Sequence, residues 1–121
     1  MDEAGWRDRI KACCESAGTY RDFFDPVIAT LAGILERRDH ADAQYKASGG
    51  NPVIAYTNKG GATNLIVNPA LQAVTKLETD ALAYWRDLGL TPAGLKRINE
   101  EAVKGKKAGR DLDDLLKEIG I

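Results

Sequence analysis

The sequence predicts a mainly α-helical fold, with a helical hairpin core of about four to five helices and a short β-hairpin between the second and third helices. Three observations lead to this prediction. Apolar residues recur every three or four positions, Asp-Pro or Asn-Pro pairs open two of the periodic segments, and a glycine-rich break with two β-prone runs separates them. The length of 121 residues suits a single helical core.

Two helices are predicted in the first half of the chain. One spans 3–17, and the other spans 25–47 and opens with Asp25 as the N-cap before a proline. Their apolar residues recur at helical spacing: Trp6, Ile10, Cys13 and Cys14 in the first helix, and Phe24, Val27, Ile28, Leu31, Ile34 and Leu35 in the second. The second helix is longer than a small core needs, so we expect residues 36–45 to be exposed or to serve subunit contact.

The segment 48–52 contains two glycines and an Asn-Pro pair, which end the second helix. Two β-prone runs follow, 53–57 and 63–67, joined by the glycine-containing loop 58–62. A two-stranded hairpin is only marginally stable alone in water. We therefore expect it to pack on helices, or else the segment to be an ordered irregular loop.

A third helix opens at Asn68-Pro69 and leads to a tight corner between two helices. Its apolar stripe consists of Leu71, Val74, Leu77, Ala81, Trp85 and Leu88. In the corner, Gly89 supplies the positive φ that ends this helix, and Thr91 caps the next one, with Pro92 at its first position. The fourth helix carries Leu95, Ile98 and Val103.

A basic, glycine-containing linker and a short amphipathic helix are predicted at the end of the chain. Asp111 caps this last helix, which presents Leu112, Leu115, Leu116 and Ile119 on one side. The predicted organisation is a helical oligomerisation and core domain at 1–103, followed by the linker and helix at 104–121. An amphipathic helix on a linker suits docking into a groove of a partner.

Charge is unevenly distributed, although the net charge is only −1. Residues 96–110, which we call the basic collar, hold six basic side chains against two acidic ones, and an acidic tail follows. The basic residues are Lys96, Arg97, Lys104, Lys106, Lys107 and Arg110. A local excess of this kind is typical of a surface that binds a polyanion.

The chain is poor in the residues that catalysis uses. It has one histidine, His40, and two adjacent cysteines, Cys13 and Cys14, without the spacing of a metal site. It also lacks a phosphate-binding Walker loop. We therefore expect no enzymatic activity, no metal and no cofactor. No apolar run approaches the roughly 20 residues of a membrane span, and the acidic start is unlike a secretory signal, so we expect an intracellular protein.

The order of these elements from residue 20 to residue 98 carries a family resemblance. An Asp-Pro-opened helix, a glycine-rich break and an Asn-Pro-opened helix ending in Trp85-Arg86-Asp87-Leu88 precede the corner string Leu-Gly-Leu-Thr-Pro, which Leu95-Lys96-Arg97-Ile98 follows. This arrangement resembles the phage terminase small-subunit family. The chain departs from it after Thr-Pro, where members typically carry Ser or Ala twice and then Arg, and this chain carries Ala93-Gly94-Leu95.

The resemblance implies a non-enzymatic component of viral DNA packaging. Members assemble into homo-oligomeric rings, bind double-stranded viral DNA near the packaging start, and deliver it to a large subunit that holds the ATPase and nuclease activities. The resemblance also implies that the protein regulates the large subunit and acts in the cytoplasm of an infected or lysogenic bacterium. It implies no membrane partner.

Three groups of residues are candidates for these contacts. For DNA, where lysine and arginine displace counterions from phosphates, they are Lys104, Lys106, Lys107 and Arg110, then Lys96, Arg97 and Arg86. For the oligomer interface they are Ile28, Leu31, Leu35, Leu71 and Val74, which are expected to serve the intrachain core first. For the large subunit they are Leu112, Leu115, Leu116 and Ile119.

Alternatives stay open at this point. The lysine-rich linker would also suit a solvated spacer, and the last helix would also suit folding back on its own chain. A small helix-turn-helix transcription regulator would place base-reading side chains just after Pro92, where Ala93 and Gly94 stand instead. A helical adaptor that binds only protein would show no salt-dependent affinity for DNA.

Overall fold

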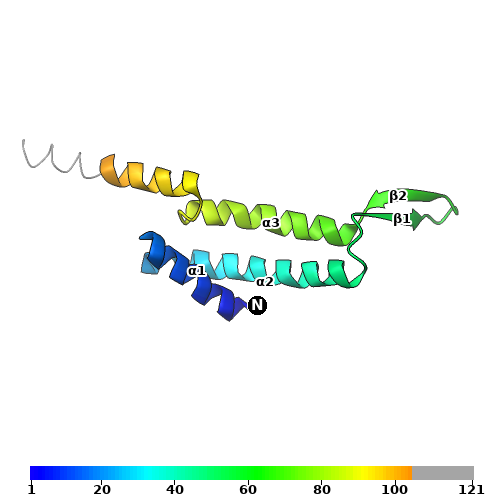
Figure 1. Ribbon diagram of the computed structural model, residues 1–121, viewed down its shortest axis with the longest axis horizontal. Helices are drawn as coiled ribbons and strands as arrows, with labels where there is room; N and C mark the ends of the chain where they lie inside the picture. The colour runs from blue at the N-terminus through cyan, green and yellow to red at the C-terminus, as the bar shows by residue number, and fades with distance from the viewer. Residues whose placement is uncertain (105–121) are drawn as a thin grey trace, which may run out of the picture.

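Two long antiparallel helices, α2 and α3, lie side by side and set the architecture of the computed structural model, which describes residues 1–104 (Figure 1). The elements in chain order are α1 (Glu3–Ala17), the 3₁₀ helix η1 (Asp22–Phe24), α2 (Asp25–Ala47), β1 (Val53–Thr57), β2 (Thr63–Val67) and α3 (Pro69–Asp87). Residues 92–104 are also helical and continue to the last described residue. Instead of four to five helices, the described part of the chain contains three α-helices with both ends defined, plus this stretch. The last predicted helix, from Asp111, lies outside the described residues.

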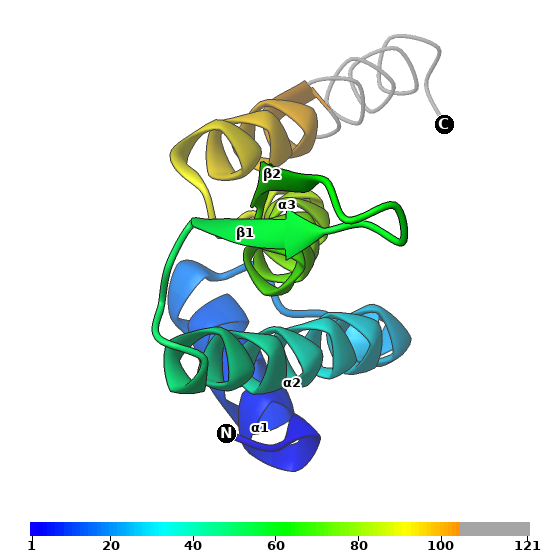
Figure 2. The same cartoon turned by 90° about the vertical axis from the view of Figure 1, so that its right-hand side faces the viewer.

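The core forms around α2, which packs against α1 on one side and α3 on the other (Figure 2). Its buried residues are Ile10, Cys14, Ile28, Leu31, Ala32, Ile34, Leu35, Ala81 and Leu88. These positions follow the predicted helical stripes. Full burial of a leucine or isoleucine side chain contributes about 1.5–3 kcal/mol, so this cluster is the main source of stability.

The first helix follows the prediction closely, with one change in its apolar stripe. Its N-cap, Asp2, accepts a hydrogen bond from the Gly5 N–H at 2.8 Å, and Gly18 ends the helix with a φ of 75°. Cys14 is buried in the core, whereas Cys13 is exposed and does not belong to the stripe. Burial raises the pKa of the Cys14 thiol above its ordinary value.

Asp25 does not cap α2 as predicted. The preceding residues already turn as the 3₁₀ helix η1, so the N-cap position falls on Phe24, and Asp25 itself has helical φ and ψ of −53° and −42°. The Asp25 carboxylate instead accepts a hydrogen bond from the Tyr20 hydroxyl at 2.8 Å. Asp25 therefore stabilises the start of α2 by bonding the Tyr20 side chain and not by capping a backbone N–H of the helix.

Part of the charged half of α2 ties the three helices together, a role that its sequence did not predict. Asp39 accepts hydrogen bonds from Trp6 Nε1 of α1 at 2.7 Å and from Arg38 Nε at 3.0 Å, and the Met1 amino group lies 3.3 Å away. Arg38 also lies 3.6 Å from Glu78 of α3. Burial alone raises the pKa of Asp39, but these donors outweigh it and hold the pKa below its usual range.

The β-hairpin forms as predicted but does not pack on the helices. Its strands pair antiparallel, with Val53 opposite Val67 and Thr57 opposite Thr63. The hairpin projects beyond the ends of α2 and α3, and no helix of residues 1–104 lies along it (Figure 1). Its base is held by Asn68, whose N–H donates to the Pro52 carbonyl at 2.8 Å and whose Nδ2 donates to the Asn51 carbonyl at 2.9 Å.

Within residues 1–104, none of the helices combines the length and apolar character needed to cross a bilayer.

Candidate nucleic-acid interface

The corner after α3 closes through the predicted glycine. Gly89 has a φ of 75°, and its N–H donates to the Arg86 carbonyl at 2.9 Å. The N–H of Leu90 donates to the Trp85 carbonyl, also at 2.9 Å. These bonds satisfy two of the carbonyls that the last turn of a helix leaves without partners. The direction in which the chain leaves α3 is therefore set by backbone hydrogen bonds.

Thr91 opens the helical stretch 92–104, and Gly94 lets that stretch rest on α3. Thr91 Oγ1 accepts a hydrogen bond from the Gly94 N–H at 3.0 Å, as expected of an N-cap. Gly94 is buried, and a Cβ at this position would collide with the Arg86 carbonyl oxygen. A close backbone approach thus explains why glycine stands where the family pattern has Ser or Ala. The sequence analysis did not predict this role. The only signal for it in the sequence is a glycine in the first turn of a predicted helix.

Gly89 also lies against the body of the protein. A Cβ on Gly89 would lie 2.7 Å from Ile98 Cδ1 and 2.9 Å from Thr19 Cγ2. Thr19 is itself buried, next to the end of α1. The side chains of Ile98 and Thr19 therefore pack across the glycine, and this contact fixes the first two turns of 92–104 on the three helices.

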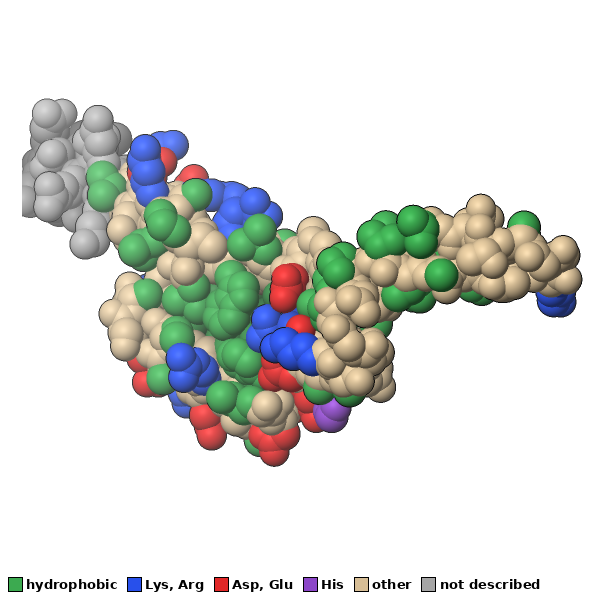
Figure 3. Space-filling view, turned by 45° about the vertical axis from the view of Figure 1, so that its right-hand side comes forward, with side chains coloured by type: hydrophobic (Ala, Val, Ile, Leu, Met, Phe, Trp, Pro, Cys, Tyr) green, Lys and Arg blue, Asp and Glu red, His purple; other side chains and the backbone are tan. Residues whose placement is uncertain are grey.

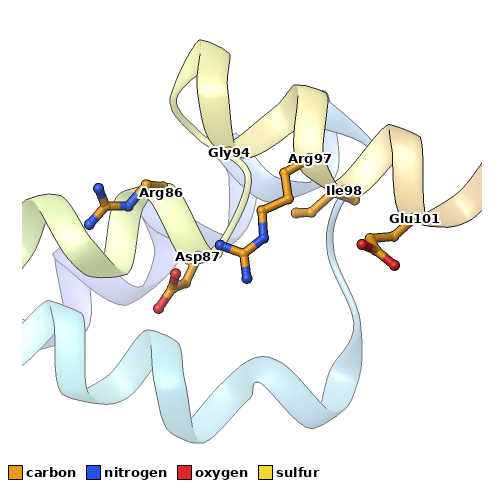
Figure 4. A pocket seen from close by; sticks show the side chains of 6 residues that line it. All are labelled: Arg86, Asp87, Gly94, Arg97, Ile98 and Glu101. Carbon is orange, nitrogen blue, oxygen red and sulfur yellow. The ribbon is translucent and has the colours of Figure 1, made fainter.

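Two of the predicted DNA-binding arginines meet at the corner. Arg86, at the end of α3, and Arg97, in the following helix, line a surface cavity of ≈ 440 Å³ together with Asp87, Gly94, Ile98 and Glu101. Arg97 reaches back toward the end of α3, where Asp87 lies, whereas Arg86 points away (Figure 4). Both arginines are exposed, and neither forms a salt bridge among residues 1–104.

The predicted lysines Lys96 and Lys104 belong to the same helical stretch but line a different surface cavity from Arg97. They border a shallow groove of ≈ 700 Å³ whose apolar floor is formed by Pro92, Leu95 and Val103. Lys96 Nζ lies 4.0 Å from Glu100 Oε1, so part of its charge is balanced. Lys104 is exposed at the end of the described chain.

The described part of the corner is close to neutral. It holds four basic side chains, Arg86, Lys96, Arg97 and Lys104, against the acidic Asp87, Glu100 and Glu101. Most of the net positive charge of the basic collar belongs to Lys106, Lys107 and Arg110, which lie outside the described residues. Their role in DNA binding stays a prediction.

The other predicted contacts fall in two places. Ile28, Leu31, Leu35 and Val74 are buried by the chain's own helices, so their side chains are not available at the surface, and only Leu71 is half-exposed. The predicted large-subunit contact, Leu112, Leu115, Leu116 and Ile119, lies outside the described residues. Four of the exposed large apolar side chains, Val53, Tyr56, Leu65 and Val67, gather on the hairpin, a feature that the search for an interface in the sequence overlooked.

Comparison with known proteins gives one match. The family model described as phage terminase, small subunit, matches residues 4–104, which cover the three helices, the hairpin and the corner. No curated protein and no solved structure matches the chain. The matched segment spans most of the chain and includes the residues that carried the resemblance in the sequence. The chain therefore belongs to the phage terminase small-subunit family.

Proposed function

We propose that this chain is the non-catalytic subunit of a phage packaging motor that binds double-stranded viral DNA at the packaging start. It delivers the DNA to the large subunit, which holds the ATPase and nuclease activities, and regulates that subunit. The observation that carries the proposal is the family match over 4–104, which supports a role in phage DNA packaging. The match ends where the helix 92–104 leads into the rest of the basic collar.

The DNA contact begins at the corner and continues along the collar. Arg97 and Lys104 are seven residues apart on one helix, which places both on the same side, two turns from each other. The corner is nearly neutral, so its basic side chains position the DNA but attract it only weakly. Lys106, Lys107 and Arg110 supply most of the attraction to phosphates. Several such weak patches on a ring-like homo-oligomer act together through a high effective concentration.

The geometry of the corner favours this function over a transcription regulator. A regulator would insert the first turn of the helix after Pro92 into the major groove. Here that turn is held against α3 at Gly94, and small side chains stand where base-reading groups would be needed. Contacts to phosphates by longer side chains further along the helix agree better with this arrangement.

The segment 104–121 completes the proposed function. The amphipathic helix predicted there from the sequence, with Leu112, Leu115, Leu116 and Ile119, docks on the large subunit, while residues 1–103 form the core and the oligomer. The protein acts in the cytoplasm of the infected or lysogenic host, where the viral DNA and the large subunit are present.

The test of the corner is DNA affinity in two matched variants. The Arg86→Ala/Arg97→Ala variant removes both arginines of the cavity, and the Arg9→Ala/Arg37→Ala control removes two exposed arginines of α1 and α2. Fluorescence anisotropy with a labelled duplex should show severalfold weaker binding for the first variant and a change within about twofold for the control. Equal affinities in the two variants would contradict the proposed site.

A further inference from the structure

Both faces of the β1–β2 hairpin are apolar. Neighbouring residues of a strand point to opposite faces, and paired residues share a face. We call one face A, formed by Val53, Ala55, Leu65 and Val67 with the Thr57–Thr63 pair next to the loop, and the other face B, formed by Ile54, Tyr56, Ile66 and Asn64. The two strands contain no charged residue. Strands that are largely apolar and carry no charge are typical of sheets whose two faces are both covered.

No helix within residues 1–104 covers either face. Leu65 of face A is 78% exposed, and Tyr56 of face B is 54% exposed. Hydrophobic side chains show on the surface of the projecting hairpin (Figure 3). Two strands alone are marginally stable in water, and exposed apolar side chains make them less so. The hairpin is therefore suited to a partner that covers both of its faces.

The chemistry of the strands excludes DNA as that partner, because they offer no positive charge to phosphates. The available area also limits the choice. Five residues per strand give a sheet about 17 Å long, and a two-stranded sheet is about 10 Å wide, so one face offers about 170 Å² in outline. This is far below the roughly 800 Å² per partner of a stable two-body interface.

A repeated contact lessens this limitation, because each copy then buries two faces instead of one. Another copy of this chain presents a hairpin of the same length and the same uncharged, apolar character, so face A of one copy matches face B of another. When every hairpin is covered by two neighbours, both faces are buried, and closure into a ring makes each small contact effectively intramolecular. The second copy is therefore the occupant that accounts for both faces at once.

We infer that the hairpin joins successive copies of this chain, with face A of each copy packed on face B of the next. The contact is head-to-tail, so it does not produce a two-fold dimer, and it generates a ring when the rotation between successive copies closes. The inference rests on the proposed function only in taking the assembly to be a ring-like homo-oligomer. It replaces Ile28, Leu31, Leu35 and Val74, which are buried in the core, as the surface between subunits.

The test uses one variant for each face. Val67→Lys/Leu65→Lys disrupts face A, and Ile54→Lys/Tyr56→Lys disrupts face B. Phe23→Lys/Leu82→Lys is the control, since both side chains are exposed and lie outside the hairpin. Native mass measurement should find a large oligomer for the wild type and the control, and a monomer for each face variant. Far-UV circular dichroism should match the wild type in all of them, because no helix packs on the hairpin.

Mixing the two face variants distinguishes this arrangement from others. The intact face B of the first variant fits the intact face A of the second, but one such contact is too small to hold a stable dimer. At high protein concentration the mixture should therefore show weak pairing, seen as NMR chemical-shift changes on the intact faces that neither variant shows alone. A monomeric wild type, wild-type mass in either face variant, or a mixture without these shifts would overturn the inference. A hairpin that binds only the large subunit would leave the wild type monomeric.

DNA binding separates this inference from the proposed function. If the face variants keep the oligomer while the Arg86→Ala/Arg97→Ala variant loses DNA affinity, the inference fails and the proposed function stands. If the face variants lose the oligomer while the arginine variant binds DNA normally, the proposed DNA site fails and the inference stands.

Discussion

The three-helix body and the two segments that project from the ends of α3 use their apolar side chains differently. In the body, Ile10 and Leu31 are completely buried between helices. In the projections, Leu65 of the hairpin and Val103 of the stretch 92–104 are mostly exposed. The body therefore has the packing that a stable fold needs, and the projections keep the surface on which partners can act.

The attachment of the two regions differs as well. The body is held by side-chain packing over the whole length of α2 and by the hydrogen bonds of Asp39. Each projection is held near its base, the hairpin at Asn68 and the helix 92–104 at the corner, where Gly94 meets Arg86 and Ile98 packs near Thr19. Single substitutions at these points should loosen a projection without unfolding the body.

The largest difference is expected between two truncations of apolar side chains. Leu31→Ala leaves a cavity in the core and should cost about 2–5 kcal/mol of unfolding free energy. Val103→Ala removes an exposed side chain and should change it by no more than about 0.5 kcal/mol. Urea denaturation followed by circular dichroism measures both values. Similar losses in the two variants would remove the distinction between body and projection.

Two glycine-to-alanine changes test the corner. Gly94→Ala forces a Cβ toward the Arg86 carbonyl and should cost about 1–3 kcal/mol, with faster hydrogen exchange at the Leu95 N–H that bonds to Thr91. Gly33→Ala is the matched control within α2, where the Cβ would meet only Arg37 Nη1 at 3.8 Å. It should stabilise the protein by about 0.5–1 kcal/mol. A neutral Gly94→Ala would mean that the corner is not tightly packed.

The Asp39 network should make the body sensitive to acid. Its folded pKa lies below the unfolded value of about 3.9, so its stabilisation is complete above that pH and is lost as the pH falls through the folded pKa. Asp39→Asn should cost about 1–2 kcal/mol at pH 7. Denaturation curves between pH 7 and pH 2 should therefore converge for the two proteins at the acidic end. A difference that stays constant over this range would argue against a charged Asp39 as the link.

The smallest effect is expected at the base of the hairpin. Asn68→Ala removes the N-cap bond to the Ala70 N–H and the bond to the Asn51 carbonyl, and should cost about 1 kcal/mol. Asn99→Ala, at an exposed position of the stretch 92–104, serves as the control and should be nearly neutral. Thermal denaturation of both variants gives the comparison, and equal melting temperatures would show that the Asn68 bonds do not hold the hairpin base.

Local signals were sufficient to predict most of the fold. The strands 53–57 and 63–67 and the ends of the first and third helices follow from glycines, prolines and capping residues that act within a few positions. Asp25 was misassigned because the 3₁₀ turn before it already continues into the helix. The links from Asp39 to Trp6 and from Arg38 to Glu78 join residues more than 30 positions apart, which no local pattern reveals.

The candidate site was predictable in position but not in detail. Thr91 and Gly89 locate the corner, and the cluster of lysines and arginines marks its charge. The structure adds which of these charges meet, since Arg86, Asp87, Arg97 and Glu101 line one cavity that the sequence alone does not indicate. The role of Gly94 follows from the approach of two helix ends, which the sequence indicates only as a glycine.

The most direct test of DNA binding through the collar is the salt dependence of affinity for a viral DNA duplex. It compares the wild type with a variant carrying alanine at Lys104, Lys106, Lys107 and Arg110, and with the Arg9→Ala/Arg37→Ala control. Each lost phosphate contact should lower the magnitude of the slope of log affinity against log salt by about 0.9. We predict a clearly shallower slope for the collar variant and the wild-type slope for the control. An unchanged affinity and slope in the collar variant would contradict the account.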